Sequence, residues 1–316
     1  MNIVRYPDRR EWAALLARPT RDAADLNATV RAVLDDVRLR GDDAVRDYEE
    51  RFDHVRLDAL TVSQCEMDEA ETLVSDELKA AIELAHGNIH RFHALQRFEG
   101  ERVDVCNGVT CWQRAIAIER VGLYIPGGTA PLFSTVLMLA TPARIAGCRE
   151  IVLCTPPDAR GKVNPAILVA ARIAGVSRIY KIGGVQAIGA MAYGTQSVPK
   201  VYKIFGPGNQ FVMCAKQQVS LHDVAIDMPA GPSEVLVLAD ATSRPDYVAA
   251  DLLSQAEHGT DSQVLMVTTC ADIIPKVEAE VERQLALLPR RDTAFQALQH
   301  SKIILMRGTD EAMELV

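Results

Sequence analysis

The chain has 316 residues, which is enough for two domains that each bury a hydrophobic core. Its 48% hydrophobic and 24% charged residues are ordinary for a globular protein. The net charge of −8 and the lack of a dense run of Lys and Arg argue against nucleic acid as a partner.

The cysteines and the N-terminus indicate a cytoplasmic protein. The seven cysteines have no CxxC spacing, and an odd number argues against a closed disulfide framework, so we expect reduced thiols. Cys148 and Cys154 flank an apolar run, which favours buried packing over a catalytic thiol. The N-terminus lacks the apolar core of a secretory signal. The most apolar stretch, TVLMLATPARIAG, is too short to span a membrane.

The first third of the chain is predicted to be helical. Residues 22–52 are typical of two helices separated at Gly41. Residues 75–98 predict one amphipathic helix with Ser75 at its N-cap, because apolar residues recur at spacings of three and four. Three histidines also lie on this helix, where the pattern favours solvent-facing positions over metal ligands: His86, His90 and His93.

After about residue 115, short apolar strands alternate with longer helices. The predicted strands are the run ending at Tyr124 and Ile125, then 150–155, 178–183, 200–206, 234–240, 262–269 and 302–306. The predicted helices are 132–146, 164–176, 185–194, 209–220, the run ending in SQAEHG, and 272–288. This alternation is typical of βαβ units with mostly parallel sheets, and the number of units favours two α/β domains.

Four loops that follow predicted strands are rich in glycine, proline and small polar residues. They are IPGGTAPLFS with Gly127 and Gly128, IGGVQAIG with Gly183, Gly184 and Gln186, FGPGNQF with Gly206, Gly208 and Asn209, and MPAGPSEV with Gly231 and Ser233. None has a dinucleotide fingerprint or a P-loop lysine. One such loop is typical of a tight turn. Four of them at the carboxyl ends of parallel strands favour a ligand cleft.

Gln255 and His258 lie three residues apart near the end of a predicted helix, and therefore on one helical face. Both side chains can bind Zn²⁺, although glutamine is an uncommon ligand. Taken alone, the stretch ending at Gly259 favours an ordinary helix terminus. Glu257 is not an acid–base partner of His258, because adjacent helical residues point about 100° apart.

Five long motifs, in order, carry a resemblance that runs over essentially the whole chain: VGLYIPGGTAPLFSTVLMLATPARIAGC, GGVQAIGAMAYGT, KIFGPGNQFV, AIDMPAGPSEVLV and DLLSQAEHGTDSQV. Together they closely resemble the histidinol dehydrogenase family. The resemblance implies a zinc-dependent, NAD-linked homodimer. Such an enzyme oxidises L-histidinol to L-histidine through histidinal, in the last steps of histidine biosynthesis.

Matching motifs also imply roles for individual residues. The implied NAD contacts are Tyr124, Gln186 and Asn209. The implied substrate contacts are Ser233, Gln255 and His258, and the last two are also implied to be two of the four zinc ligands. Zinc in this family orients the substrate, which is one of the recognised roles of a catalytic metal.

The sequence also departs from the family. The family's other zinc ligands, an Asp and a His, and its general-base Glu-His pair belong to segments beyond Val316, and Glu257-His258 is not equivalent to that pair. We therefore expect no catalytic base in this chain and an inactive 316-residue form. Two alternatives stay open: a truncated, non-catalytic homologue that binds nucleotide, and a related dehydrogenase of another small alcohol.

The expected fold is α/β, with two Rossmann-like domains, mostly parallel sheets and N-terminal helical segments. Residues 1–20 are expected to form an appendage. Residues 121–233 are expected to form the NAD-binding domain. Residues 21–120 and 234–316 are expected to form a discontinuous second domain that carries the implied zinc ligands, a division that comes from the family resemblance.

Overall fold

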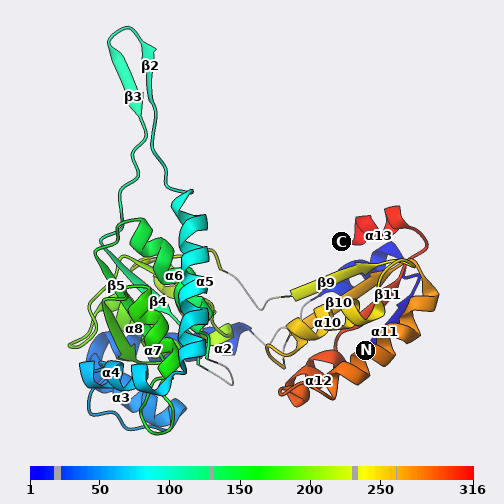
Figure 1. The fold of residues 1–316 in the computed structure, drawn as a ribbon, viewed down its shortest axis with the longest axis horizontal. Helices are drawn as coiled ribbons and strands as arrows, with labels where there is room; N and C mark the ends of the chain where they lie inside the picture. Colours follow the sequence, from blue (N-terminus) through cyan, green and yellow to red (C-terminus); the bar gives the residue numbers. More distant parts are fainter. Residues whose placement is uncertain (18–22, 128–130, 230–233, 261) are drawn as a thin grey trace. The chain divides into compact units, whose positions relative to one another are not determined.

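The computed structural model describes residues 1–17, 23–127, 131–229, 234–260 and 262–316. The chain forms two compact units, one of Ala24–Pro229 and one of Met1–Ala23 with Ala230–Val316. Each unit is a parallel sheet with helices packed on it, which confirms the α/β prediction (Figure 1). Within the described ranges, no helix is long and apolar enough to cross a membrane.

The larger unit contains a five-stranded parallel sheet with the order β6-β5-β4-β7-β8. Its strands are β4 (Arg120–Tyr124), β5 (Glu150–Thr155), β6 (Arg178–Lys181), β7 (Lys203–Phe205) and β8 (Ala225–Ile226). Strands covered on both faces are apolar throughout. In β5, Leu153 faces one hydrophobic core and Cys154 the other, as the alternation of side chains along a strand requires. Cys148 and Cys154 are both buried thiols, as predicted.

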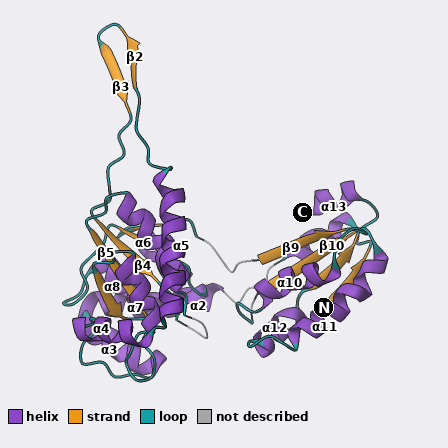
Figure 2. Cartoon of the chain, in the orientation of Figure 1, coloured by secondary structure: helices purple, strands orange, loops and turns teal. Residues whose placement is uncertain are grey.

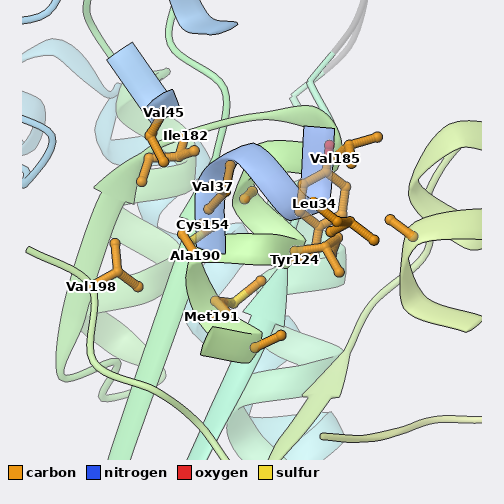
Figure 3. Packing of buried hydrophobic residues seen from close by; sticks show 14 of the residues in the cluster. Leu34, Val37, Val45, Tyr124, Cys154, Ile182, Val185, Ala190, Met191 and Val198 are labelled. Atoms are coloured by element: carbon orange, nitrogen blue, oxygen red, sulfur yellow. The ribbon is translucent and has the colours of Figure 1, made fainter. Parts of the chain in front are cut away.

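Helices cover both faces of this sheet. One core contains residues from α2 (Ala23–Arg40), α3 (Asp42–Tyr48), α8 (Gly184–Tyr193) and α9 (Gln210–Ser220). The other contains residues from α4 (Gln64–Leu73), α5 (Asp76–Ala94), α6 (Phe133–Ile145) and α7 (Pro165–Ile173). Figure 3 shows the first core, where Leu34 and Val37 of α2 pack near Tyr124, Ala190 and Met191.

Local signals explain the helix boundaries in the N-terminal part. Gly41 adopts φ 61° between α2 and α3, a conformation that favours glycine. Ser75 caps α5, where its hydroxyl accepts a hydrogen bond from the Leu78 N–H at 3.3 Å. After α5, strands β2 (Arg102–Cys106) and β3 (Val109–Trp112) form an exposed antiparallel hairpin that the sequence pattern did not predict (Figure 2).

The smaller unit contains a four-stranded parallel sheet with the order β1-β11-β10-β9. Its strands are β1 (Asn2–Arg5), β9 (Glu234–Ala239), β10 (Gln263–Thr268) and β11 (Lys302–Leu305). One core packs this sheet against α10 (Pro245–Ala256), α11 (Ile274–Leu285) and α12 (Arg291–Gln299). A smaller core packs it against α1 (Trp12–Leu16) and α13 (Thr309–Leu315). Three short helical turns complete the elements: η1 (Arg9–Glu11), η2 (Glu49–Asp53) and η3 (Ala271–Ile273).

The compact units differ from the division expected from the sequence. Residues 24–120 belong with the 121–229 sheet and not with 234–316, because the apolar face of α2 is buried against α8. The first residues are not an appendage, because β1 pairs with β11 at the edge of the smaller sheet. Tertiary packing determines which sheet the residues before 120 join, and no local pattern in the sequence predicts that packing.

Candidate functional site

A cavity of about 1320 Å³ opens at the carboxyl end of the five-stranded sheet. Its walls include residues that follow four different strands: Pro126 after β4, Pro156 after β5, Gly184 after β6 and Asn209 after β7. From β4 the chain runs through β5 to β6 on one side, and then continues through β7 to β8 on the other. The strand order therefore reverses at β4, where an open α/β sheet binds its ligands.

Tyr124 ends β4 and lies in the wall of this cavity. Its hydroxyl oxygen accepts a hydrogen bond from the Gly184 N–H at 3.1 Å. Burial raises the pKa of the Tyr124 hydroxyl above its usual range, so the side chain is a neutral phenol at physiological pH. The phenol proton is consequently available to a hydrogen-bond acceptor on a ligand.

Gln186 lies in the first turn of α8, fully buried, and also lines the cavity. Its Nε2 donates a hydrogen bond to Glu49 Oε1 at 2.8 Å. Its Oε1 has no hydrogen-bond partner among the described residues, and neither does Thr155 Oγ1 in the same cavity wall. Buried polar atoms are nearly always paired, so these two acceptors are open to a hydrogen bond from a water or a ligand.

Asn209 follows β7 and is the N-cap of α9. Its Oδ1 accepts hydrogen bonds from the N–H groups of Phe211 and Val212 at 3.0 and 3.1 Å. The side chain is exposed at the cavity, and its Nδ2 group can still donate to a ligand.

The loop before Asn209 is held close to β4. Gly206 has φ 129°, and a Cβ placed there would lie 2.1 Å from the Tyr124 carbonyl oxygen, so only glycine fits. The buried Lys216 donates from Nζ to the Gly206 carbonyl at 2.7 Å and pairs with Asp227. Asp227 in turn accepts from the Gly206 N–H at 2.9 Å. The strand order, the glycine and this ion pair together bring Asn209 to the same cavity as Tyr124.

Glu49 and Asp53 form an acidic pair beside the cavity that the sequence analysis missed. Glu49 is fully buried, and Asp53 lines the cavity. Burial raises the pKa of Glu49 to about 7, with a further rise from the Asp53 carboxylate, while hydrogen bonds from Gln186 and Gly183 oppose the rise. Burial also raises the pKa of Asp53. Both lie in a run of charged residues, RDYEERFD, that looks like an ordinary helix surface.

The remaining predicted site residues belong to the smaller unit. Gln255 is buried near the end of α10, and His258 is exposed two residues after that helix ends. The His258 N–H bonds to the Gln255 carbonyl at 3.1 Å, so both side chains start from one helical turn. Ser233 lies outside the described residues.

The structure brings three of the six predicted residues, Tyr124, Gln186 and Asn209, together around one cavity. For zinc, Gln255 and His258 start from one helical turn, with Gln255 buried and His258 exposed. Across the described ranges, no three His, Cys, Asp or Glu side chains come together as a metal-binding group. The described residues therefore do not complete a metal site.

Comparisons with known proteins identify the family. A family model described as histidinol dehydrogenase matches residues 16–316. The chain is 64% identical over 315 residues to a histidinol dehydrogenase of Bacteroides thetaiotaomicron, covering 100% of this chain and 74% of that relative. The chain belongs to the histidinol dehydrogenase family.

Further histidinol dehydrogenases support this placement. The enzyme of Salmonella typhimurium is 56% identical over 305 residues, which are 96% of this chain and 69% of that relative. The crystal structure of histidinol dehydrogenase from Elizabethkingia anophelis matches with a TM-score of 0.93 at 50% identity. That match covers 100% of this chain and 73% of the crystallised one. The fold described above is therefore the fold of a histidinol dehydrogenase over the part that the two chains share.

Proposed function

We propose that this member of the histidinol dehydrogenase family takes part in the NAD-dependent oxidation of L-histidinol to L-histidine through histidinal. The observation that carries the proposal is the family match over residues 16–316. The convergence of Tyr124, Gln186 and Asn209 on a single cavity at the strand-order reversal supports it independently.

Each oxidation removes a hydride and a proton, first from the alcohol and then from the hydrate of the aldehyde. Two NAD⁺ are therefore reduced for each L-histidine formed. NAD⁺, when bound, supplies a nicotinamide ring that accepts the hydride. The chain's own residues bind and orient: Gln186 Oε1 accepts a hydrogen bond, and the Tyr124 phenol donates one. Phe52 and Phe211 line the cavity with partly exposed rings that can stack on flat heterocycles.

Charges in the cavity favour NAD over NADP. Two cations occur among the described lining residues, and each is paired: Arg160 with Asp158 at 3.2 Å and Lys162 with Glu69 at 3.0 Å. Asp53 adds a further carboxyl group to the wall. A 2′-phosphate would meet no unpaired cation among these residues, whereas a ribose hydroxyl can donate to a carboxylate.

The substrate and zinc assignments follow from the family resemblance. We propose that Ser233, Gln255 and His258 contact L-histidinol, and that Gln255 and His258 also hold one edge of a Zn²⁺ site. Zinc, when bound, orients the substrate through its nitrogen atoms. We also propose a homodimer and a cytoplasmic location, and light scattering coupled to gel filtration tests the first of these.

A paired assay tests the function. The 316-residue chain and the longest natural reading frame are each mixed with L-histidinol, NAD⁺ and Zn²⁺, and NADH formation is followed by absorbance. We expect turnover by the longer form, loss of that turnover with a chelator, and no turnover by the 316-residue form. Turnover only with another small alcohol would support a related dehydrogenase. NAD⁺ binding without turnover by either form would support a non-catalytic homologue.

A further inference from the structure

Glu49 occupies an unusual position for a carboxylate. It begins the turn η2, far from the glycine loops in sequence, and its side chain is completely buried. Its Oε1 accepts two hydrogen bonds, from the Gly183 N–H at 3.0 Å and from Gln186 Nε2 at 2.8 Å. No Lys or Arg pairs with it among the described residues. A buried carboxylate without a cation is held by such hydrogen bonds, and here one comes from Gly183 just before α8 and the other from Gln186 in the first turn of α8.

The contact with Glu49 fixes the orientation of the Gln186 amide. An amide carries a donor nitrogen and an acceptor oxygen, so anchoring Nε2 on a carboxylate determines where Oε1 points. Gln186 lines the cavity, and its Oε1 is buried and has no hydrogen-bond partner among the described residues. If the amide turned over, this unpartnered position would hold a donor in place of an acceptor. Above about pH 7, where Glu49 is ionised, it disfavours that alternative, because an acceptor atom facing its carboxylate would be repelled.

We propose that Glu49 is a positioning residue for dinucleotide binding, which holds Gln186 so that Oε1 accepts a hydrogen bond from an O–H or N–H group of the nicotinamide dinucleotide. This inference rests on the proposed NAD-binding function. Glu49 itself does not reach the ligand in this arrangement. It acts on the ligand through Gln186, and its second hydrogen bond, from the Gly183 N–H, holds the Glu49 carboxyl group itself in place.

NAD⁺ titration of the 316-residue chain by calorimetry tests the inference. Glu49→Ala removes both hydrogen bonds and should weaken NAD⁺ binding roughly tenfold or more. Glu49→Gln keeps an acceptor oxygen of the same reach, so it should stay within about threefold of the wild-type affinity. Gln186→Ala removes the group through which Glu49 acts. The double variant Glu49→Ala/Gln186→Ala should therefore bind no more than about twofold more weakly than Gln186→Ala alone.

Asp42→Ala is the matched control. Asp42 is also a buried carboxylate in the same unit, and it accepts hydrogen bonds from the Ser197 N–H at 3.2 Å and from its hydroxyl. This variant should lose stability without a comparable loss of NAD⁺ affinity. If Glu49→Ala has no cooperative thermal transition, Glu49→Asp replaces it, because the shortened carboxylate cannot reach both donors and should weaken binding in the same direction.

The outcomes separate the inference from the function on which it rests. Wild-type NAD⁺ affinity in Glu49→Ala overturns the positioning role and leaves the NAD site intact. The same conclusion follows if the losses of affinity in Glu49→Ala and Gln186→Ala multiply in the double variant. An equal loss in Asp42→Ala also overturns it, because the effect would then be one of general stability. Failure of the wild-type chain to bind NAD⁺ overturns both the inference and the proposed cofactor.

Discussion

The cavity of the larger unit and the end of α10 in the smaller unit assemble their candidate residues in opposite ways. Tyr124, Gln186 and Asn209 are distant in sequence and meet because parallel strands deliver their following loops to one edge of a sheet. Gln255 and His258 are neighbours because they are three residues apart in one helical turn. Topology thus builds the cavity, whereas local helical spacing relates the two residues of the proposed zinc site. Four predictions test that difference.

The largest effect is expected at the point where the loop after β7 crosses β4. Gly206→Ala forces a Cβ against the Tyr124 carbonyl at a positive φ, so the free energy of unfolding should fall by roughly 3 to 5 kcal/mol. NAD⁺ binding should be lost with it. Gly87→Ala in α5, where a Cβ meets open space, is the control and should stabilise by about 0.5 to 1 kcal/mol. Denaturant unfolding of both variants measures this, and equal stabilities would contradict the close approach.

The second prediction concerns the pH dependence of stability. Burial raises the pKa of Glu49 from 4.5 to about 7, so the folded chain retains a proton that the unfolded chain releases in this interval. The contribution is fully present below pH 4.5 and is lost as the pH rises towards 7, by about 3 kcal/mol. Glu49→Gln carries no such proton and should remove most of that fall. The free energy of unfolding of the wild-type chain and of Glu49→Gln, measured at about pH 5 and about pH 8, tests this linkage. An equal change between the two pH values in both proteins would refute it.

The third prediction separates capping from ligand binding at Asn209. Asn209→Ala and Ser75→Ala each remove an N-cap hydrogen bond, so each should lower the free energy of unfolding by about 1 kcal/mol. Only Asn209→Ala should also weaken NAD⁺ binding, because Ser75 does not line the cavity. Thermal unfolding and NAD⁺ titration of both variants are needed. An unchanged NAD⁺ affinity in Asn209→Ala would show that Asn209 caps α9 but does not contribute to NAD⁺ binding.

The smallest effect is expected when Zn²⁺ binds to the 316-residue chain and changes its free energy of unfolding. Two donors bind the ion weakly, so Zn²⁺ at a concentration no more than about three times its Kd should raise the free energy of unfolding by less than about 1 kcal/mol. His258→Ala should abolish that increase, whereas His90→Ala, an exposed histidine on α5, should not change it. Thermal unfolding with zinc and after chelation measures the difference. A large stabilisation by zinc would show that further donors converge on α10.

The sequence predicted the parts of the fold that local patterns determine. Continuous apolar runs placed β5, β9 and β11 within a residue or two, and the flanking Gly41 and Ser75 placed helix ends. The β2–β3 hairpin and α12 were missed. The hairpin buries nothing, and α12 is short, with a buried face that consists only of Ala294, Ala297 and Leu298. Their stability depends on context that neighbouring residues do not encode.

The site residues divide in the same way into those that a local sequence pattern reveals and those that only tertiary packing reveals. Loops after parallel strands can be recognised in the sequence, so the cavity's glycines and Gln186 were found. Glu49 was not, because a glutamate in a charged helical run looks the same whether it faces solvent or a buried amide. What distinguishes it is the contact with Gly183, which only the packing of η2 under α8 creates.

The helix starts around the cavity carry a consequence for anions. The first amides of α7, α8 and α9 are already bonded to protein oxygens, from Asn164, from Glu49 with the Tyr124 hydroxyl, and from Asn209. A pyrophosphate could use these bonded amides only by exchanging places with a side chain, and for them the bonds gained and lost would nearly cancel. Because both cations described in the cavity wall are also paired, NAD⁺ binding should depend only weakly on salt concentration.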